Sequence, residues 1–182
     1  MSQQEGLFTE LRIAGITRES VVDGPGMRFV IFTQGCPHNC PGCHNPETHD
    51  PTGGKLMDST EIINMIEQAH LIRGVTFSGG EPFLQANALA KIAIAARRHG
   101  LDIVTYTGFL FEKLLERAVT DTKVLALLTN TDILIDGPYK KEERDLRLAF
   151  RGSCNQRLID VPKSLTAGRA ITWQDPYLKN FS

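Results

Sequence analysis

The chain has 182 residues, of which 41% are hydrophobic and 23% charged, so it has the composition of one ordinary globular domain and not of a disordered segment. Twenty Lys and Arg residues against 21 Asp and Glu leave a formal net charge of −1, which gives no reason to expect nucleic acid or an anionic membrane as a partner. Without a long apolar run or a signal-peptide pattern, the chain is expected to be a cytoplasmic, single-domain protein over residues 1–182.

Short apolar runs, each followed by a polar or glycine-rich turn, predict the strands. Residues 11–17 and Arg28–Thr33 are separated by the turn sequence DGPG and predict an antiparallel hairpin. Further strands are predicted downstream at residues 75–77, 103–106 and 133–135, with weaker candidates at 158–161 and 170–173.

Helical patterns separate these runs. Asp58 followed by Glu61 resembles a capping box and predicts that a helix begins there. A second helix is predicted around residues 89–96, where two arginines and Gly100 mark its end, and a third over Phe111–Ala118.

Alternating strands and helices indicate an α/β fold with a parallel sheet and right-handed crossovers. A closed eight-stranded barrel takes about 250 residues, so the chain is too short for one. The expectation is an open partial (βα) barrel of about five or six mostly parallel strands, with a doubly wound sheet as the alternative. Both architectures carry their chemistry at the carboxyl ends of the strands.

Three of the four cysteines lie within eight residues, in the spacing C-x3-C-x2-C over Cys36, Cys40 and Cys43. Soft sulfur ligands select zinc or iron–sulfur clusters. Zinc takes four ligands, and a nearby histidine (His38, His44 or His49) could be the fourth. A cluster held by only three cysteines instead leaves one iron open for a further ligand. The loop at residues 35–46 is therefore the candidate metal site.

The cysteine spacing after the first hairpin resembles the radical S-adenosylmethionine superfamily, and residues 78–82 (SGGEP) resemble its second motif. One departure is Gly42, which stands where the superfamily often has an aromatic residue. The adenine contact of such a residue must then come from His44 or from the local backbone.

Further segments resemble the activating enzymes of glycyl-radical proteins, namely residues 22–28 (VDGPGMR) and 43–46 (CHNP). The proline and glycine between the last two cysteines, residues 136–139 (DGPY) and residues 151–157 (RGSCNQR) are most similar to the activases of anaerobic ribonucleoside-triphosphate reductases. The resemblance covers about residues 22–157.

The resemblance implies that Cys36, Cys40 and Cys43 ligate a [4Fe–4S] cluster. Its open iron would chelate S-adenosylmethionine, and one electron from a donor such as a flavodoxin would release a 5'-deoxyadenosyl radical. That radical would take a hydrogen from a glycine of the reductase large subunit. No catalytic residue is expected beyond the ligands of the cluster and the cofactor.

The resemblance also implies a set of cofactor-binding residues: Gly42, Cys43, His44, Gly79, Gly80, Glu81, Thr107, Asp136 and Asn155. The two adjacent glycines would let the backbone approach the ligand, and Glu81 would accept a hydrogen bond from its ammonium group. Thr107 and Asp136 would either contact the ribose hydroxyls or cap turns.

Other interpretations stay open. The protein could activate another glycyl-radical enzyme of the formate-lyase type, act on a small molecule, or be a zinc-binding module without catalysis. Trp173, Tyr177 and Phe181 recur every four residues, so the tail at 173–182 either packs on the domain or contacts the partner. Cys154 is expected to be a small buried hydrophobe, and His38 and His49 solvated loop residues.

Overall fold

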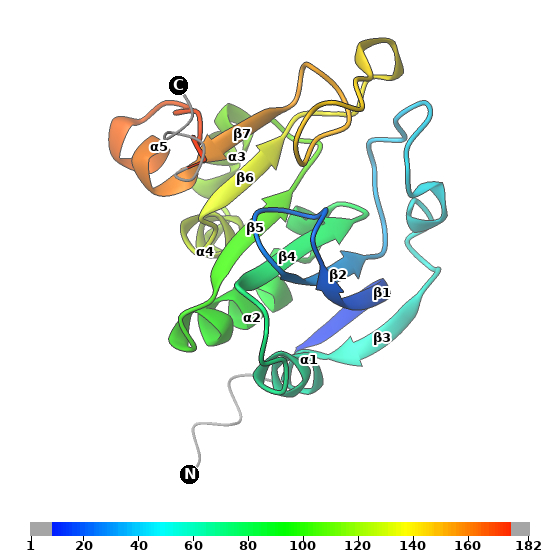
Figure 1. Ribbon diagram of the computed structural model, residues 1–182, viewed down its shortest axis with the longest axis vertical. Helices are drawn as coiled ribbons and strands as arrows, with labels where there is room; N and C mark the ends of the chain where they lie inside the picture. Colours follow the sequence, from blue (N-terminus) through cyan, green and yellow to red (C-terminus); the bar gives the residue numbers. More distant parts are fainter. Residues whose placement is uncertain (1–8, 176–182) are drawn as a thin grey trace.

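The protein is described by a computed structural model in which residues 9–175 are placed (Figure 1). Its seven strands form one sheet in the order β3-β1-β2-β4-β5-β6-β7. Their bounds are β1 (Glu10–Ser20), β2 (Arg28–Thr33), β3 (Lys55–Asp58), β4 (Gly74–Gly79), β5 (Asp102–Tyr106), β6 (Ile133–Asp136) and β7 (Arg157–Asp160). The middle strands β2, β4, β5 and β6 are parallel, whereas the β1–β2, β1–β3 and β6–β7 pairs are antiparallel.

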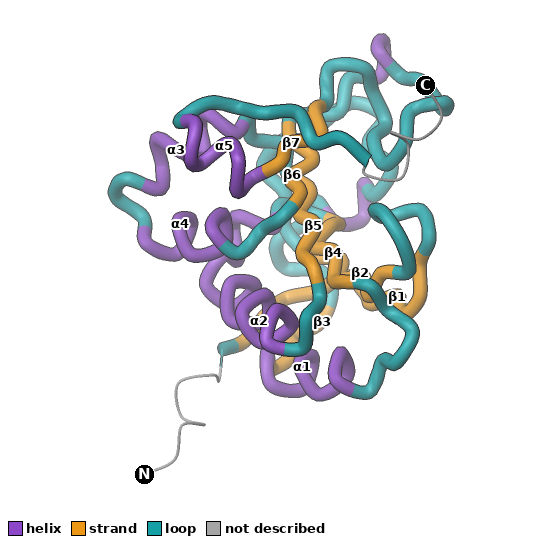
Figure 2. Tube along the Cα trace, turned by 60° about the vertical axis from the view of Figure 1, so that its left-hand side comes forward, coloured by secondary structure: helices purple, strands orange, loops and turns teal. Residues whose placement is uncertain are grey.

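Five α-helices within the described residues cover one face of this sheet, while loops lie over the other face (Figure 2). The helices are α1 (Ser59–Glu67), α2 (Ala86–Arg98), α3 (Phe111–Ala118), α4 (Thr122–Thr129) and α5 (Val161–Ala167). Short 3-10 turns occur at Pro46–Thr48, Pro82–Gln85 and Lys141–Glu143. None of the helices formed by residues 9–175 is long and apolar enough to cross a membrane.

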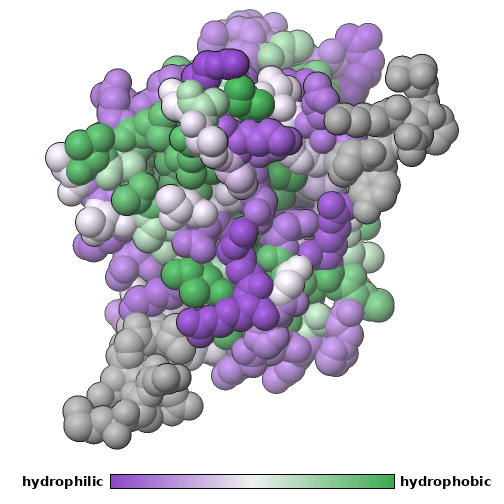
Figure 3. Space-filling view, turned by 90° about the vertical axis from the view of Figure 1, so that its left-hand side faces the viewer, coloured by the Kyte–Doolittle hydropathy of each residue, from purple (hydrophilic) through white to green (hydrophobic). Residues whose placement is uncertain are grey.

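The core lies between the sheet and the helices because each helix turns one apolar stripe inward. In α2, Leu89, Ile92 and Ala93 are fully buried against the strands. The central strand β2 has five of its six residues buried, as expected for a strand covered on both faces. On the face seen in Figure 3, hydrophilic side chains are interspersed with groups of hydrophobic ones.

Several sequence predictions are confirmed. The hairpin of residues 11–17 with Arg28–Thr33 is the β1–β2 pair, and the third predicted helix has the bounds of α3. The predicted start of the first helix is also right, because the Asp58 carboxylate accepts a hydrogen bond from the Thr60 backbone N–H at 2.8 Å.

The predicted number of strands, five or six, was too low, and half of the six strand pairings are antiparallel. The edge strand β3 escaped prediction because it has four residues and only Met57 is buried, too short for an alternating pattern. The weak candidate at 170–173 forms only an isolated bridge between Thr172 and Ile159. Residue Val161, assigned to a strand, begins α5, whose first turn holds Pro162 and is capped by Asp160.

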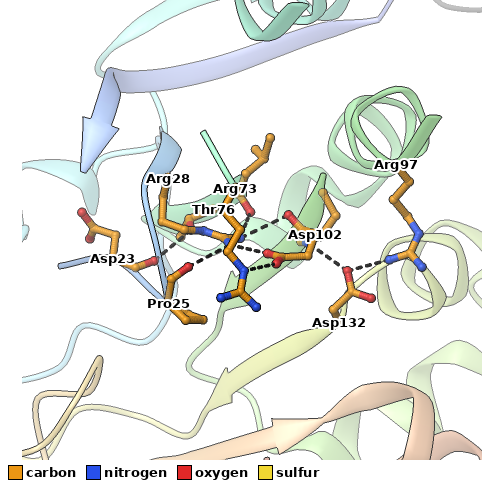
Figure 4. A network of polar contacts seen from close by, with 10 residues as sticks. Asp23, Pro25, Arg28, Arg73, Thr76, Arg97, Asp102 and Asp132 are labelled. Carbon is orange, nitrogen blue, oxygen red and sulfur yellow. Dashed lines mark hydrogen bonds and ion pairs between the residues drawn. The ribbon is translucent and has the colours of Figure 1, made fainter. Parts of the chain in front are cut away.

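The turn between β1 and β2 is held over the loop-covered face of the sheet by a buried polar network (Figure 4). Arg28 is fully buried and donates to the Thr76 hydroxyl, the Pro25 carbonyl and the Asp102 carboxylate. The Thr76 hydroxyl in turn donates to the Asp23 carbonyl at 2.8 Å. This network fixes the backbone that brings residues 22 and 23 to the cavity described next.

Candidate functional site

A cavity of about 540 Å³ opens at the carboxyl ends of the parallel strands. Its walls come from the loop after β2, the ends of β4 and β5, the β1–β2 turn and the segment 137–156 that follows β6. The location is the one expected for a site on a parallel sheet.

All three clustered cysteines line this cavity, and each is half-buried. The loop that carries them is closed at its base, where the backbone N–H of Cys36 donates to the His49 carbonyl at 3.2 Å. A tight turn between Cys40 and Cys43 (3.1 Å, backbone N–H to carbonyl) uses Gly42 at φ +74°. Glycine adopts this left-handed conformation without strain.

The surroundings of the thiols favour the protonated form when no metal is bound. Burial raises the pKa of Cys36 and of Cys40, and the neighbouring thiols raise the pKa of Cys36 further. Backbone N–H groups oppose the shift, since His38 donates to Cys36 and Tyr139 to Cys40. The same N–H groups would support thiolates once a metal centre deprotonates them.

The donor set was compared with the metal groups that the sequence suggests. Within residues 9–175, no three His, Cys, Asp or Glu side chains are grouped closely enough to hold a single metal ion. Three thiols on the wall of one cavity fit a larger group, such as a [4Fe–4S] cluster with three cysteine ligands.

The adjacent glycines Gly79 and Gly80 line the cavity, and the close packing around them is a second reason why these two positions require glycine. A Cβ on Gly79, which has φ +90°, would lie 2.7 Å from the Thr33 backbone nitrogen, and a Cβ on Gly80 would lie 2.4 Å from the Gly35 carbonyl oxygen. Only glycine permits β4 to end this close to the loop that follows β2. Because neither residue has a side chain, a ligand in the cavity can approach their main chain.

The structure separates the nine predicted cofactor-binding residues into two groups. On the cavity wall lie Cys43, His44, Gly79, Gly80 and Thr107. Outside the wall formed by the described residues lie Gly42, Glu81, Asp136 and Asn155. Their contact with a cofactor stays a prediction, which the geometry supports for the first group only.

Asp136 has the surroundings of a capping residue. It is fully buried, accepts the Phe111 backbone N–H at 2.7 Å at the first turn of α3, and pairs with Arg157. Arg157 also pairs with Glu112, and these two carboxylates raise the pKa of the guanidinium. Asn155 donates to the Pro138 carbonyl at 2.8 Å and so supports the turn after β6.

Several residues of the wall were not predicted to bind the cofactor: Asp23, His38, His49, Ser78, Tyr106, Tyr139, Phe150, Arg151 and Gln156. Two of them carry a buried nitrogen without a hydrogen-bond partner among the described residues, His49 at Nε2 and Arg151 at Nε. The motif at residues 151–157 could have indicated Arg151, but no sequence signal distinguishes Tyr106 from its neighbours in β5.

The structure also bears on three further predictions, for Cys154, His38 and the C-terminal aromatic residues. Cys154 is exposed, so its expected burial was wrong, because it lies in a surface turn beyond the sheet. His38 is not solvated, since its imidazole bonds to Glu81 at 2.6 Å. Trp173 packs against the small hydrophobic cluster of Val104, Ile133 and Ile135, whereas Tyr177 and Phe181 lie outside the described residues.

Comparison with known proteins gives a consistent result. The family model described as a 4Fe-4S single cluster domain matches residues 22–159. A protein of Enterobacteria phage T4 is 35% identical over 144 residues, which span 75% of this chain and 86% of the relative. Relatives from Haemophilus influenzae (34%, 75% and 89%) and Escherichia coli K12 (35%, 75% and 90%) match similarly. All three are named anaerobic ribonucleoside-triphosphate reductase-activating protein.

Proposed function

This chain belongs to the family of anaerobic ribonucleoside-triphosphate reductase-activating proteins, and on that premise we propose that it generates a glycyl radical on such a reductase. It would do so with a [4Fe–4S] cluster and S-adenosylmethionine. The observation that carries the proposal is that Cys36, Cys40 and Cys43 all line one cavity, whose wall also contains Gly79 and Gly80.

The architecture supports an open partial barrel of the radical S-adenosylmethionine type. The parallel middle strands end at the cavity. The described helices cover one face of the sheet, and the β1–β2 turn lies on the other face together with the loops (Figure 2). Such an arrangement leaves room for a partner segment to approach the strand ends.

When bound, the cluster supplies the single electron that cleaves the sulfonium of S-adenosylmethionine. The role of the chain's own residues is to bind and orient the cluster and the cofactor. The three thiolates on the cavity wall would hold the cluster, and the backbone near Gly79 and Gly80 would receive the cofactor's polar groups. Tyr106 stays protonated because burial raises its pKa, and its hydroxyl donates to the Phe150 carbonyl at 2.7 Å. This hydrogen bond joins the end of β5 to the segment that follows β6, and both residues line the cavity.

The decisive experiment is reconstitution with iron and sulfide under strictly anaerobic conditions. The expected product contains inorganic sulfide, and its reduced cluster gives an electron paramagnetic resonance signal that S-adenosylmethionine alters. Cys40→Ala should abolish that signal, whereas Cys154→Ala should leave it, because Cys154 is exposed and lies outside the cavity wall. A colourless protein that holds zinc and lacks sulfide would contradict the proposal.

The identity of the target needs a second measurement. Incubation with the anaerobic reductase should produce a glycyl-radical signal, while incubation with a formate-lyase-type protein should not. The opposite result would favour the activase of another glycyl-radical enzyme. A flavodoxin-type electron donor and a cytoplasmic location remain predictions from the sequence.

A further inference from the structure

Glu81, the acidic residue of the glycine motif, lies in an unexpected environment for a cofactor ligand. Its side chain is fully buried, and it stands outside the cavity wall formed by the described residues. A carboxylate without solvent contact must be hydrogen-bonded or paired to remain stable in the folded protein. The question is therefore which groups satisfy it.

Both carboxylate oxygens of Glu81 are already engaged by the protein. Oε1 accepts the Phe83 backbone N–H at 3.0 Å and the Thr107 hydroxyl at 2.9 Å. Oε2 accepts the Gly108 backbone N–H at 2.9 Å, is 3.0 Å from the same hydroxyl, and contacts His38 Nε2 at 2.6 Å. Since a carboxylate offers about four acceptor positions, little capacity is left for an ammonium group.

The partner His38 connects this carboxylate to the cysteine loop, because it stands between Cys36 and Cys40 in the chain. Its backbone N–H donates to the Cys36 thiol, and its ring packs edge-on against Phe109 with centroids 4.6 Å apart. The ring also touches Gly108, where an added Cβ would lie 2.3 Å from His38 Cδ2. The imidazole is thus fixed by a hydrogen bond, a ring contact and a close approach of backbone.

We propose that Glu81 is a positioning residue, which acts through His38 to hold the turn between Cys36 and Cys40 against the ends of β4 and β5. This rests on the proposed function, because it assigns the ammonium of S-adenosylmethionine to the main chain of the glycine pair instead of to the Glu81 carboxylate. The carboxylate sets the position of the thiols and does not touch the cofactor.

The first test uses the full chain without a cluster. The proposal predicts that Glu81→Gln and His38→Phe both accelerate alkylation of Cys36 and Cys40 by about threefold, through local opening of the loop. The Phe variant keeps an aromatic ring against Phe109 and removes both ring nitrogens, including the Nε2 that contacts Glu81. The exposed Cys154 serves as the internal reference. Unchanged alkylation rates in the His38 variant would overturn the proposal.

The second test measures retention of the cluster by reconstituted protein in the presence of a chelator. Removing a residue that holds a metal's ligands in place typically weakens metal affinity 10–100-fold, so each single variant should lose iron and sulfide at least about tenfold faster than the wild type. The double variant should be no worse than the more severe single one, since both changes break one linkage. Additive losses would overturn the linkage.

The third test separates positioning from ligation by comparing S-adenosylmethionine with an analogue that lacks the α-amino group. The preference for the natural cofactor, read from the altered resonance signal of the reduced cluster, should be the same in Glu81→Gln, His38→Phe and the wild type. Loss of this preference in Glu81→Gln alone would show that the carboxylate binds the ammonium and would overturn the proposal.

The matched control is the exposed pair formed by Glu67 and His99, whose Oε1 and Nε2 atoms lie 3.1 Å apart. Glu67→Gln and His99→Phe should behave as the wild type in all three measurements. If the wild type takes up no sulfide, the proposed function fails, but the alkylation test still decides whether Glu81 positions the loop. The His38 variant keeps the test valid if Glu81→Gln does not fold.

Discussion

Arg28 shows how a charged side chain can be accommodated in the interior of the protein. Its guanidinium has no exposed surface, and burial lowers its pKa while Asp102 opposes that shift. The side chain reaches the carbonyls of Pro25 and Val75 as well as the Thr76 hydroxyl (Figure 4). A planar group with five donors can satisfy several acceptors at once, which an ammonium group cannot do with the same geometry.

Arg28→Lys should therefore destabilise the protein strongly. The free energy of unfolding, measured by urea denaturation, should fall by about 3 kcal/mol because buried acceptors lose their donors. Arg97→Lys, in the more exposed pair with Asp132, should change it by less than about 1 kcal/mol. Equal effects of the two substitutions would show that the buried network does not hold the β1–β2 turn.

Tyr106 gives a prediction about pH. Burial raises its pKa in the folded protein above the value of about 10 for an exposed tyrosine, so the folded state resists ionisation that the unfolded state undergoes. The corresponding stability is fully present below about pH 10 and is lost as the pH rises towards the folded pKa.

Tyr106→Phe should remove this dependence. The variant loses the hydrogen bond to the Phe150 carbonyl, which lowers stability by about 1 kcal/mol at neutral pH. Its urea midpoint should then fall less steeply than that of the wild type between about pH 9 and 11. If the urea midpoints of the two proteins fell in parallel over this pH range, the raised pKa of Tyr106 would be contradicted.

At the scale of elements, the cysteine loop is held by close packing as well as by hydrogen bonds. Gly108, just beyond β5, contacts the His38 ring on one side of the loop. Gly42 and Lys141 meet near its other end, where an added Cβ would lie 3.2 Å from the lysine side chain. The loop conformation thus depends on residues that are distant in sequence.

Gly108→Ala should displace the His38 ring, because its new Cβ cannot fit at the present spacing. We expect a loss of about 1–3 kcal/mol in the free energy of unfolding, the usual result of overpacking, together with faster cluster loss. Gly15→Ala should have little effect on cluster loss, since nothing lies within 4 Å of its added Cβ. In a His38→Ala background, Gly108→Ala should cost less free energy of unfolding than it does in the wild type, because the ring that meets the new Cβ is gone. An equal cost in both backgrounds would show that the clash is not with His38.

At the scale of the whole molecule, the cavity has an apolar and accessible rim. Val22 is 72% exposed and Leu146 is 82% exposed, and both line the cavity from different segments. Apolar side chains on the accessible rim can be buried when another protein covers the cavity. This supports entry of the reductase segment that bears the glycine, with the partner completing the enclosure of the site.

Leu146→Asp should weaken binding of the reductase about tenfold, because a charge would be buried at the contact. Binding can be measured by calorimetry with the reductase large subunit. Leu71→Asp is the matched control, since Leu71 is 74% exposed and lies away from the cavity wall. Equal affinity of both variants would mean that the partner does not approach across this rim.

The sequence by itself determined some of the elements and the position of the three clustered thiols. Apolar runs and helix caps are local features, so β2, α3 and the start of α1 could be predicted with their bounds. The spacing of Cys36, Cys40 and Cys43 is also local, and it placed three thiols in one loop.

Only the tertiary structure decided which polar residues face the cavity. Glu81, Asp136 and Thr107 all lie at or just beyond strand ends and look equivalent in the sequence. All three take part in buried hydrogen bonds, yet Thr107 lies on the cavity wall, whereas Glu81 and Asp136 lie outside the wall formed by the described residues. The orientation of a side chain at a strand end depends on donors supplied by distant segments, such as His38 for Glu81 and Arg157 for Asp136. Buried acceptors take whichever donors the fold brings to them, and sequence spacing does not contain that information.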